Sequence, residues 1–190
     1  MMVYDAGRMT KLMLDPAIGT LIVLCLALLF AGAGSHKLRD LPQFSAIFAA
    51  YELLPQLARP QLAVLVPLLE CLLACGLLVR RTRTPAVVAA MLLLLGYAAA
   101  IGINLRRGRS DLACGCGGFD ARRVIAPWML WRNVLLVAVL GLVLLPWSAR
   151  ALEWLDAVTV GCGTVTCGLV YLCLDRLLGQ SARSSALRIS

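Results

Sequence analysis

Two cysteines one residue apart are the part of this sequence best suited to chemistry. They are Cys114 and Cys116, and Gly115, Gly117 and Gly118 around them can adopt turns that other residues resist. Disulfide geometry is restrictive, so a bond between cysteines this close would close a small strained ring that is readily reduced and exchanged. The spacing therefore predicts a redox pair that exchanges rather than a permanent structural bridge.

The chain around this pair is basic, which favours the same chemistry. A positive environment stabilises thiolate, the reactive form of cysteine, and the nearby cations are Arg106, Arg107, Arg109, Arg122 and Arg123. Two alternatives stay open for Cys114 and Cys116. They could form half of a metal site, or they could be two loop cysteines without chemistry.

Glu70 is the second candidate site residue, because it lies near the middle of an apolar segment. An ionisable group at membrane depth is costly and is functional by default. We expect Glu70 to be either a proton carrier or a structural clamp between helices, and we expect Glu70 and Arg132 of a later segment either to approach one another or each to meet another polar group. Arg132 could instead extend its charged end to the membrane surface.

The single histidine, His36, stands beside Lys37 just after the first apolar segment. Both residues are expected to be anchors at the membrane interface. Because no second histidine exists, a histidine-based metal site is not predicted, and no metal ligand set is assigned.

The other six cysteines lie inside apolar segments, where a thiol usually packs as a small hydrophobic group. They are Cys25, Cys71, Cys75, Cys162, Cys167 and Cys173. Cys71 and Cys75 are four residues apart and share one helix face, which would allow them to receive electrons. Packing is the expected role for all six.

The elements that must position these residues are helices in a membrane. Of the 190 residues, 61% are hydrophobic, against about 45–50% in soluble domains. Apolar runs near the length of a bilayer span alternate with short basic stretches, so we predict a single all-α membrane domain over residues 1–190. The net charge of +8 lies beside these runs, where lipid headgroups are the partner, and no separate basic domain is left to bind nucleic acid.

Five spans are predicted, forming a four-helix core plus a fifth helix: 17–34, 62–79, 86–105, 126–147 and 157–174. A cleaved signal peptide is the alternative for the first. Residues 41–54 have apolar positions at helical spacing, which predicts an amphipathic helix at the membrane interface. The Cys-Gly-Cys pair falls in a polar loop at 106–125, and the tail after 174 is expected to be frayed.

Four motifs resemble one known family in their order and spacing. They are Gly34-Ser35-His36-Lys37-Leu38, Tyr51-Glu52-Leu53-Leu54-Pro55, Pro67-Leu68-Leu69-Glu70 and Cys114-Gly115-Cys116. Over about residues 17–147 the sequence resembles the methylamine utilisation protein MauE family, which is related to DoxX-like membrane proteins. One departure is that the family often continues its cysteine pair with Phe-Gly, whereas Gly117-Gly118-Phe119 follows here.

The resemblance implies a multi-pass membrane protein. It further implies a role, with the thioredoxin-like MauD, in maturation of the small, disulfide-rich subunit of methylamine dehydrogenase. The layout is also similar to vitamin K epoxide reductase, although the Cys-x-x-Cys of that enzyme is missing. A quinone cofactor is suggested by this analogy alone.

The charge distribution bears on which side of a bacterial inner membrane the cysteines face. The side that carries Cys114 and Cys116 has more Lys and Arg in total, which by simple counting would make it cytoplasmic. The turn at Arg80, Arg81 and Arg83 is the shortest and densest basic loop, and it favours the opposite orientation. We expect the cysteine pair to be periplasmic, where disulfide exchange for exported proteins takes place.

Three functions compete at this point. The leading hypothesis is a thiol–disulfide oxidoreductase component in which Cys114 and Cys116 cycle during oxidative maturation of an exported protein. The second is a non-catalytic membrane chaperone or scaffold that binds the same client. The third is a small transporter that uses Glu70 and Arg132.

Overall fold

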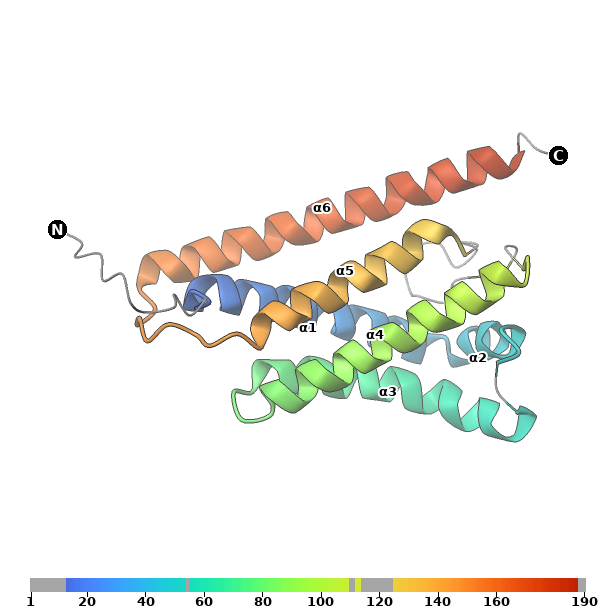
Figure 1. Cartoon of the computed structure of the whole chain (residues 1–190), viewed down its shortest axis with the longest axis horizontal. Helices are drawn as coiled ribbons and strands as arrows, with labels where there is room; N and C mark the ends of the chain where they lie inside the picture. Colours follow the sequence, from blue (N-terminus) through green and yellow to red (C-terminus); the bar gives the residue numbers. More distant parts are fainter. Residues whose placement is uncertain (1–12, 54, 110–111, 114–124, 188–190) are drawn as a thin grey trace, which may run out of the picture.

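The computed structural model describes residues 13–53, 55–109, 112–113 and 125–187, and it is a bundle of helices (Figure 1). Within these residues the only extended pairing is a single bridge between Leu14 and Trp147. The fold is therefore the predicted all-α membrane bundle.

Among the described residues, four helices are long and apolar enough to cross a membrane: α1 (Pro16–Arg39), α3 (Arg59–Leu78), α4 (Arg83–Arg106) and the Trp154–Leu174 part of α6 (Trp154–Leu187). The fifth predicted span corresponds to α5 (Pro127–Val143), which has 17 residues. A helix of this length is about 26 Å long, whereas the hydrocarbon core of a bilayer is about 30 Å thick. The short α2 (Leu41–Ala50) follows α1, and one 3-10 turn, η1 (Gln56–Ala58), precedes α3. Large apolar side chains such as Leu72, Leu92 and Leu135 cover the outside of the bundle, as contact with lipid requires.

Two aspartates mark where the first helices begin. The Asp15 carboxylate accepts the backbone N–H of Ala17 at 2.8 Å, and Pro16 occupies the first turn of α1. Asp40 separates α1 from α2 and caps α2 by accepting the N–H of Gln43 at 3.2 Å. The chain therefore turns at Asp40, whose side chain caps the start of α2.

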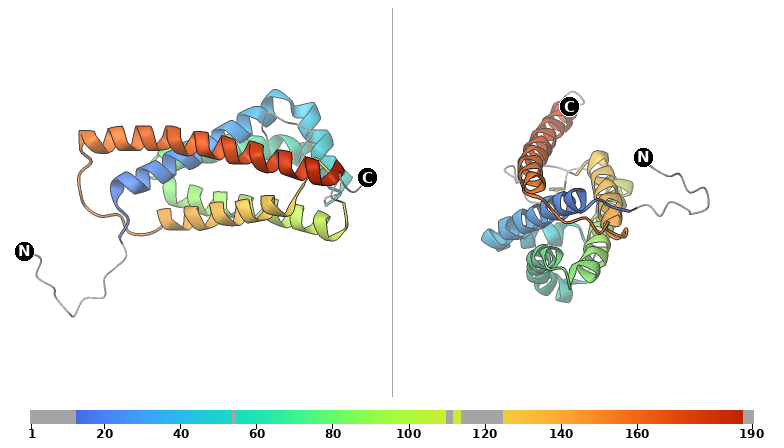
Figure 2. Two further views of the ribbon diagram at one scale, coloured as in Figure 1. Left: turned by 90° about the horizontal axis from the view of Figure 1, so that it is seen from above. Right: turned by 90° about the vertical axis from the view of Figure 1, so that its left-hand side faces the viewer.

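The helices run alternately up and down, so the bundle has two ends (Figures 1 and 2). The α2 end carries α2, the last turn of α4 and the first turn of α5. The opposite end carries the α3–α4 turn and the segment between α5 and α6. Helix α1 packs against α3, α4 packs against α5, and α6 packs mainly against α1.

Two apolar clusters fill the bundle. The larger one occupies the half away from α2 and includes Phe30 of α1, Leu77 of α3, Leu94 of α4 and Leu140 of α5. The smaller one lies at the α2 end and consists of Ile101, Leu112, Ile125 and Met129.

Several helix ends differ from those expected from sequence. Helix α1 continues past residue 34 to Arg39, and α6 continues through the expected frayed tail to Leu187. Helix α5 ends at Val143, four residues early, because Pro146 cannot continue it, and Trp147 folds back so that its indole N–H donates to the Val143 carbonyl at 3.2 Å. Helix α2 stops at Ala50, before Pro55, and Pro60 lies in the first turn of α3, where proline is tolerated.

Candidate functional site

Cys114 and Cys116 lie outside the described residues, but the base of their loop is described. The Ile125 backbone N–H donates to the Leu112 carbonyl at 2.8 Å, and both side chains are buried in the smaller apolar cluster. This backbone hydrogen bond joins the two ends of the loop, two residues before Cys114. The loop leaves the bundle at the α2 end.

Arg109 connects the start of this loop to the end of α2. Its guanidinium donates to the Glu52 carboxylate at 2.9 Å and to the Ala50 carbonyl at 3.1 Å. Glu52 has a φ of 50°, a left-handed conformation that is uncommon for residues other than glycine. This contact holds the α2–η1 connection against the residues that lead into the cysteine loop.

The strongest polar feature of the described residues is an ion pair inside the bundle. Lys37 Nζ of α1 lies 2.5 Å from Glu70 Oε1 of α3, and the two residues are only 4% and 1% exposed. Removing one partner from such a pair leaves an uncompensated buried charge. Loss of either partner alone should therefore destabilise the bundle.

Tyr97 of α4 completes the cluster. Its hydroxyl donates to Glu70 Oε1 at 2.7 Å and accepts from Lys37 Nζ at 3.2 Å. Lys37 Nζ also lies 4.8 Å from the centroid of the Tyr97 ring and 5.3 Å from that of Phe44 in α2, within the range of cation–π attraction. Three spanning helices and α2 thus meet at this Lys37–Glu70–Tyr97 cluster.

A close approach of α1 and α3 makes this contact possible, and Gly34 permits it. A Cβ atom at Gly34 would lie 2.7 Å from Cys71 Sγ and 2.9 Å from the Pro67 carbonyl oxygen. Lys37 is three residues after Gly34 on the same face, and Glu70 is three residues after Pro67. The glycine therefore sets the distance across which the ammonium group reaches the carboxylate.

The expectation that Glu70 meets a polar group inside the bundle is confirmed, but Arg132 is the wrong partner. The Arg132 guanidinium is directed elsewhere, donating to the Tyr171 hydroxyl at 3.5 Å and lying 5.5 Å from the Trp128 ring centroid. Both aromatic residues lie on α5 and α6, whereas Glu70 faces α1 and α4. The arrangement of the helices decides which residue pairs with Glu70, and the linear sequence does not give that arrangement.

The assignment of Lys37 as an interface anchor is also wrong, whereas its neighbour His36 is exposed. The signal for Lys37 was present in the helical period: buried Val23, Phe30, Gly34 and Lys37 all follow one face of α1. Because α1 continues to Arg39, Lys37 stays inside the bundle.

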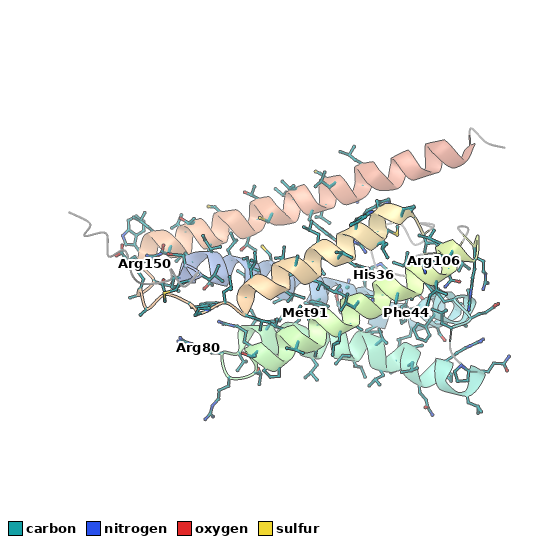
Figure 3. All side chains as sticks on the ribbon, viewed as in Figure 1. His36, Phe44, Arg80, Met91, Arg106 and Arg150 are labelled. Carbon is teal, nitrogen blue, oxygen red and sulfur yellow. The ribbon has the colours of Figure 1, made fainter. Side chains whose placement is uncertain are left out.

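Figure 3 shows Phe44 and Arg106 at the α2 end, with Arg80 and Arg150 at the opposite end.

Two buried amides were not predicted from sequence. Asn104 of α4 is fully buried, and its amide donates to the Ala100 carbonyl at 3.1 Å and to the Tyr51 carbonyl at 3.4 Å. Asn133 of α5 is 2% exposed.

Burial raises the pKa of Tyr51 to about 12, so its phenol stays protonated at neutral pH.

The six cysteines of the apolar segments are not all packed as expected. Cys25 and Cys71 are half-buried, whereas Cys75, Cys162, Cys167 and Cys173 are exposed on the outside of the bundle. In the described ranges no three His, Cys, Asp or Glu side chains gather into a metal site.

Comparisons with known proteins identify one family. The family model "Methylamine utilisation protein MauE" matches residues 15–147. A protein named methylamine utilization protein MauE from Paracoccus denitrificans is 33% identical over 180 residues, covering 94% of this chain and 96% of its own length. Proteins of the same name from Methylorubrum extorquens and Methylophilus methylotrophus are 33% and 29% identical over similar shares of each chain.

No solved structure matches the chain. The family model covers both partners of the buried pair, Lys37 and Glu70, together with Tyr97 and the cysteine loop. This multi-pass helical membrane protein belongs to the methylamine utilisation protein MauE family.

Proposed function

We propose that this protein acts in methylamine utilisation as an inner-membrane component that assists maturation of the small subunit of methylamine dehydrogenase. The observation that carries the proposal is its similarity, along nearly its whole length, to proteins named for methylamine utilisation. A thioredoxin-like protein such as MauD is the proposed partner. The cysteine loop at the α2 end is the proposed working surface.

The proposed chemistry is thiol–disulfide exchange at Cys114 and Cys116. The loop disulfide takes two electrons and two protons from two client thiols, which become a disulfide as the loop cysteines become thiols. Support comes from the joined base of the loop at Leu112 and Ile125 and from the arginines before it, which favour thiolate.

We expect the double variant Cys114→Ser, Cys116→Ser to abolish most growth on methylamine in a strain that lacks the native copy. The client should accumulate with free thiols, which gel-shift alkylation of the small subunit would measure. The matched control is Cys75→Ser with Cys173→Ser, two exposed thiols in the spans, which should leave growth and client oxidation unchanged. If the loop variant oxidises its client normally, the protein acts as a scaffold and the exchange chemistry is wrong.

We also propose that the α2 end faces the periplasm. The residues that flank the cysteine loop lie with α2 at one end of the bundle, and Ala149 lies at the other end. This arrangement allows an orientation test with single-cysteine variants. In intact cells, an impermeant maleimide should label Cys114 and Gln43→Cys, and Ala149→Cys should react only after lysis. The reverse pattern would place the loop in the cytoplasm. Labelling of Gln43→Cys and Cys114 from opposite sides would contradict the bundle itself.

A further inference from the structure

A second pair of thiols lies between the first and last helices of the bundle. The Cys25 thiol of α1 is hydrogen-bonded to the side chains of Thr164 and Cys167 of α6. Both cysteines are free thiols, and both belong to spanning helices rather than to the cysteine loop. Two sulfur atoms in side-chain contact need only a small movement to reach the S–S bond length of about 2.05 Å.

The packing of these two helices supports the contact independently. Helices α1 and α6 both run toward the α2 end, so they are parallel (Figures 1 and 2), and α6 packs mainly against α1. A Cβ atom at Gly163 of α6 would lie 3.1 Å from Leu21 Cδ1 of α1, which fixes their register. Four residues later come Cys25 on α1 and Cys167 on α6. One helical turn beyond a tight contact therefore brings both thiols to the same level on facing sides.

The pair lies at membrane depth and is open on one side. Cys25 is about 14 Å along α1 and Cys167 about 20 Å along α6, well within spans of a hydrocarbon core of about 30 Å. Cys25 is half-buried, whereas Cys167 is exposed on the outside of the bundle. Next to Cys167, a Cβ atom at Gly168 would meet nothing within 4 Å. Molecules dissolved in the lipid can therefore reach the Cys167 thiol.

This location restricts the oxidant that the two thiols can meet. Glutathione disulfide is charged, and charged or polar molecules enter hydrocarbon only at a large cost in free energy. A quinone with a hydrocarbon chain dissolves in the bilayer. It accepts two electrons and two protons, which is what two thiols release when they form a disulfide. A lipid-soluble quinone is thus the class of oxidant that fits the site.

We propose that Cys25 and Cys167 form a redox site inside the membrane, where a lipid-soluble quinone oxidises the two thiols to a disulfide that joins α1 to α6. Two S–H bonds break and one S–S bond forms. The quinone takes both electrons and both protons and becomes the hydroquinone, so the step is balanced. This site goes beyond the proposed maturation role, and its chemistry does not require the cysteines of the loop.

Oxidation of the full chain in lipid nanodiscs tests this proposal. The protein carries Cys114→Ser and Cys116→Ser, so that the loop cannot contribute, and it is reduced and then incubated with decylubiquinone without oxygen. After quenching with N-ethylmaleimide, mass spectrometry of the digested chain should show peptides linked through Cys25 and Cys167. Ultraviolet absorbance should show one hydroquinone formed for each disulfide. Oxidised glutathione, which stays in water, should leave both thiols reduced.

Single variants identify the thiols that react. Cys25→Ala and Cys167→Ala should each abolish both the linked peptide and the hydroquinone, whereas Cys162→Ala, which removes another exposed thiol of α6, should keep both. The proposal is wrong if decylubiquinone leaves the two thiols reduced, or if hydroquinone forms without the link between them. Equally rapid oxidation by glutathione disulfide would also overturn it, because the pair would then be open to water. None of these outcomes bears on whether the loop cysteines oxidise a client.

Discussion

We expect the substitution Glu70→Leu to lower the free energy of unfolding by about 3–5 kcal/mol, the usual cost of breaking a buried ion pair from one side. The substitution removes the carboxylate that Lys37 and Tyr97 both contact and leaves the ammonium group buried among apolar side chains. Reversible unfolding of the purified protein in mixed detergent micelles, followed by circular dichroism, would measure the change.

The double variant Lys37→Met, Glu70→Leu separates the pair from its individual charges. Because apolar residues of similar volume often replace a buried pair without loss, this variant should recover most of the stability that Glu70→Leu loses. Glu52→Gln is the control, since its ion pair with Arg109 is largely exposed and exposed pairs contribute about 0–1 kcal/mol. A double variant as unstable as Glu70→Leu would mean that hydrogen bonding through Tyr97, rather than charge pairing, holds the site.

The second large effect is expected at Gly34. In Gly34→Ala the new methyl group would meet Cys71 Sγ and the Pro67 carbonyl oxygen below 3 Å, so α1 and α3 must separate. Overpacking of this kind costs about 1–3 kcal/mol, and the separation also lengthens the contact between Lys37 and Glu70. The same unfolding assay should show this loss.

Gly32→Ala is a matched control on the same helix. Nothing lies within 4 Å of a Cβ atom at Gly32, so alanine there should be neutral or stabilising by up to about 1 kcal/mol through helix propensity. Adding Cys71→Ala to Gly34→Ala should restore stability only in part, because the Pro67 carbonyl cannot move without its helix. Equal stabilities of Gly32→Ala and Gly34→Ala would contradict the close approach of α1 and α3.

The helical membrane fold follows from sequence because the bilayer imposes a simple requirement. Every backbone polar group must be satisfied within the chain, so an apolar run of sufficient length becomes a helix whatever its neighbours are. The ends of these helices were less predictable. The apolar run stops at residue 34, but helix α1 continues through His36 and Lys37 to Arg39 and ends at Asp40.

The candidate site was only half predictable. Glu70 is conspicuous in sequence because a carboxylate in an apolar segment is rare, and the cysteine pair is conspicuous because of its spacing. Asn104 and Asn133 gave no such signal, since amides near the ends of spans are ordinary. Only the bundle shows that both are almost completely buried.

The sequence by itself determined that the chain spans a membrane as helices, that Glu70 would need a polar partner there, and that Cys114 and Cys116 fall in a polar segment between two apolar runs. Only the tertiary structure decided that the partner is Lys37 with Tyr97 rather than Arg132. The physical reason is that partner choice depends on which helices touch and in what register. The contact between α1 and α3 at Gly34 sets both, because the two backbones come close enough there for the ammonium and carboxylate groups to meet.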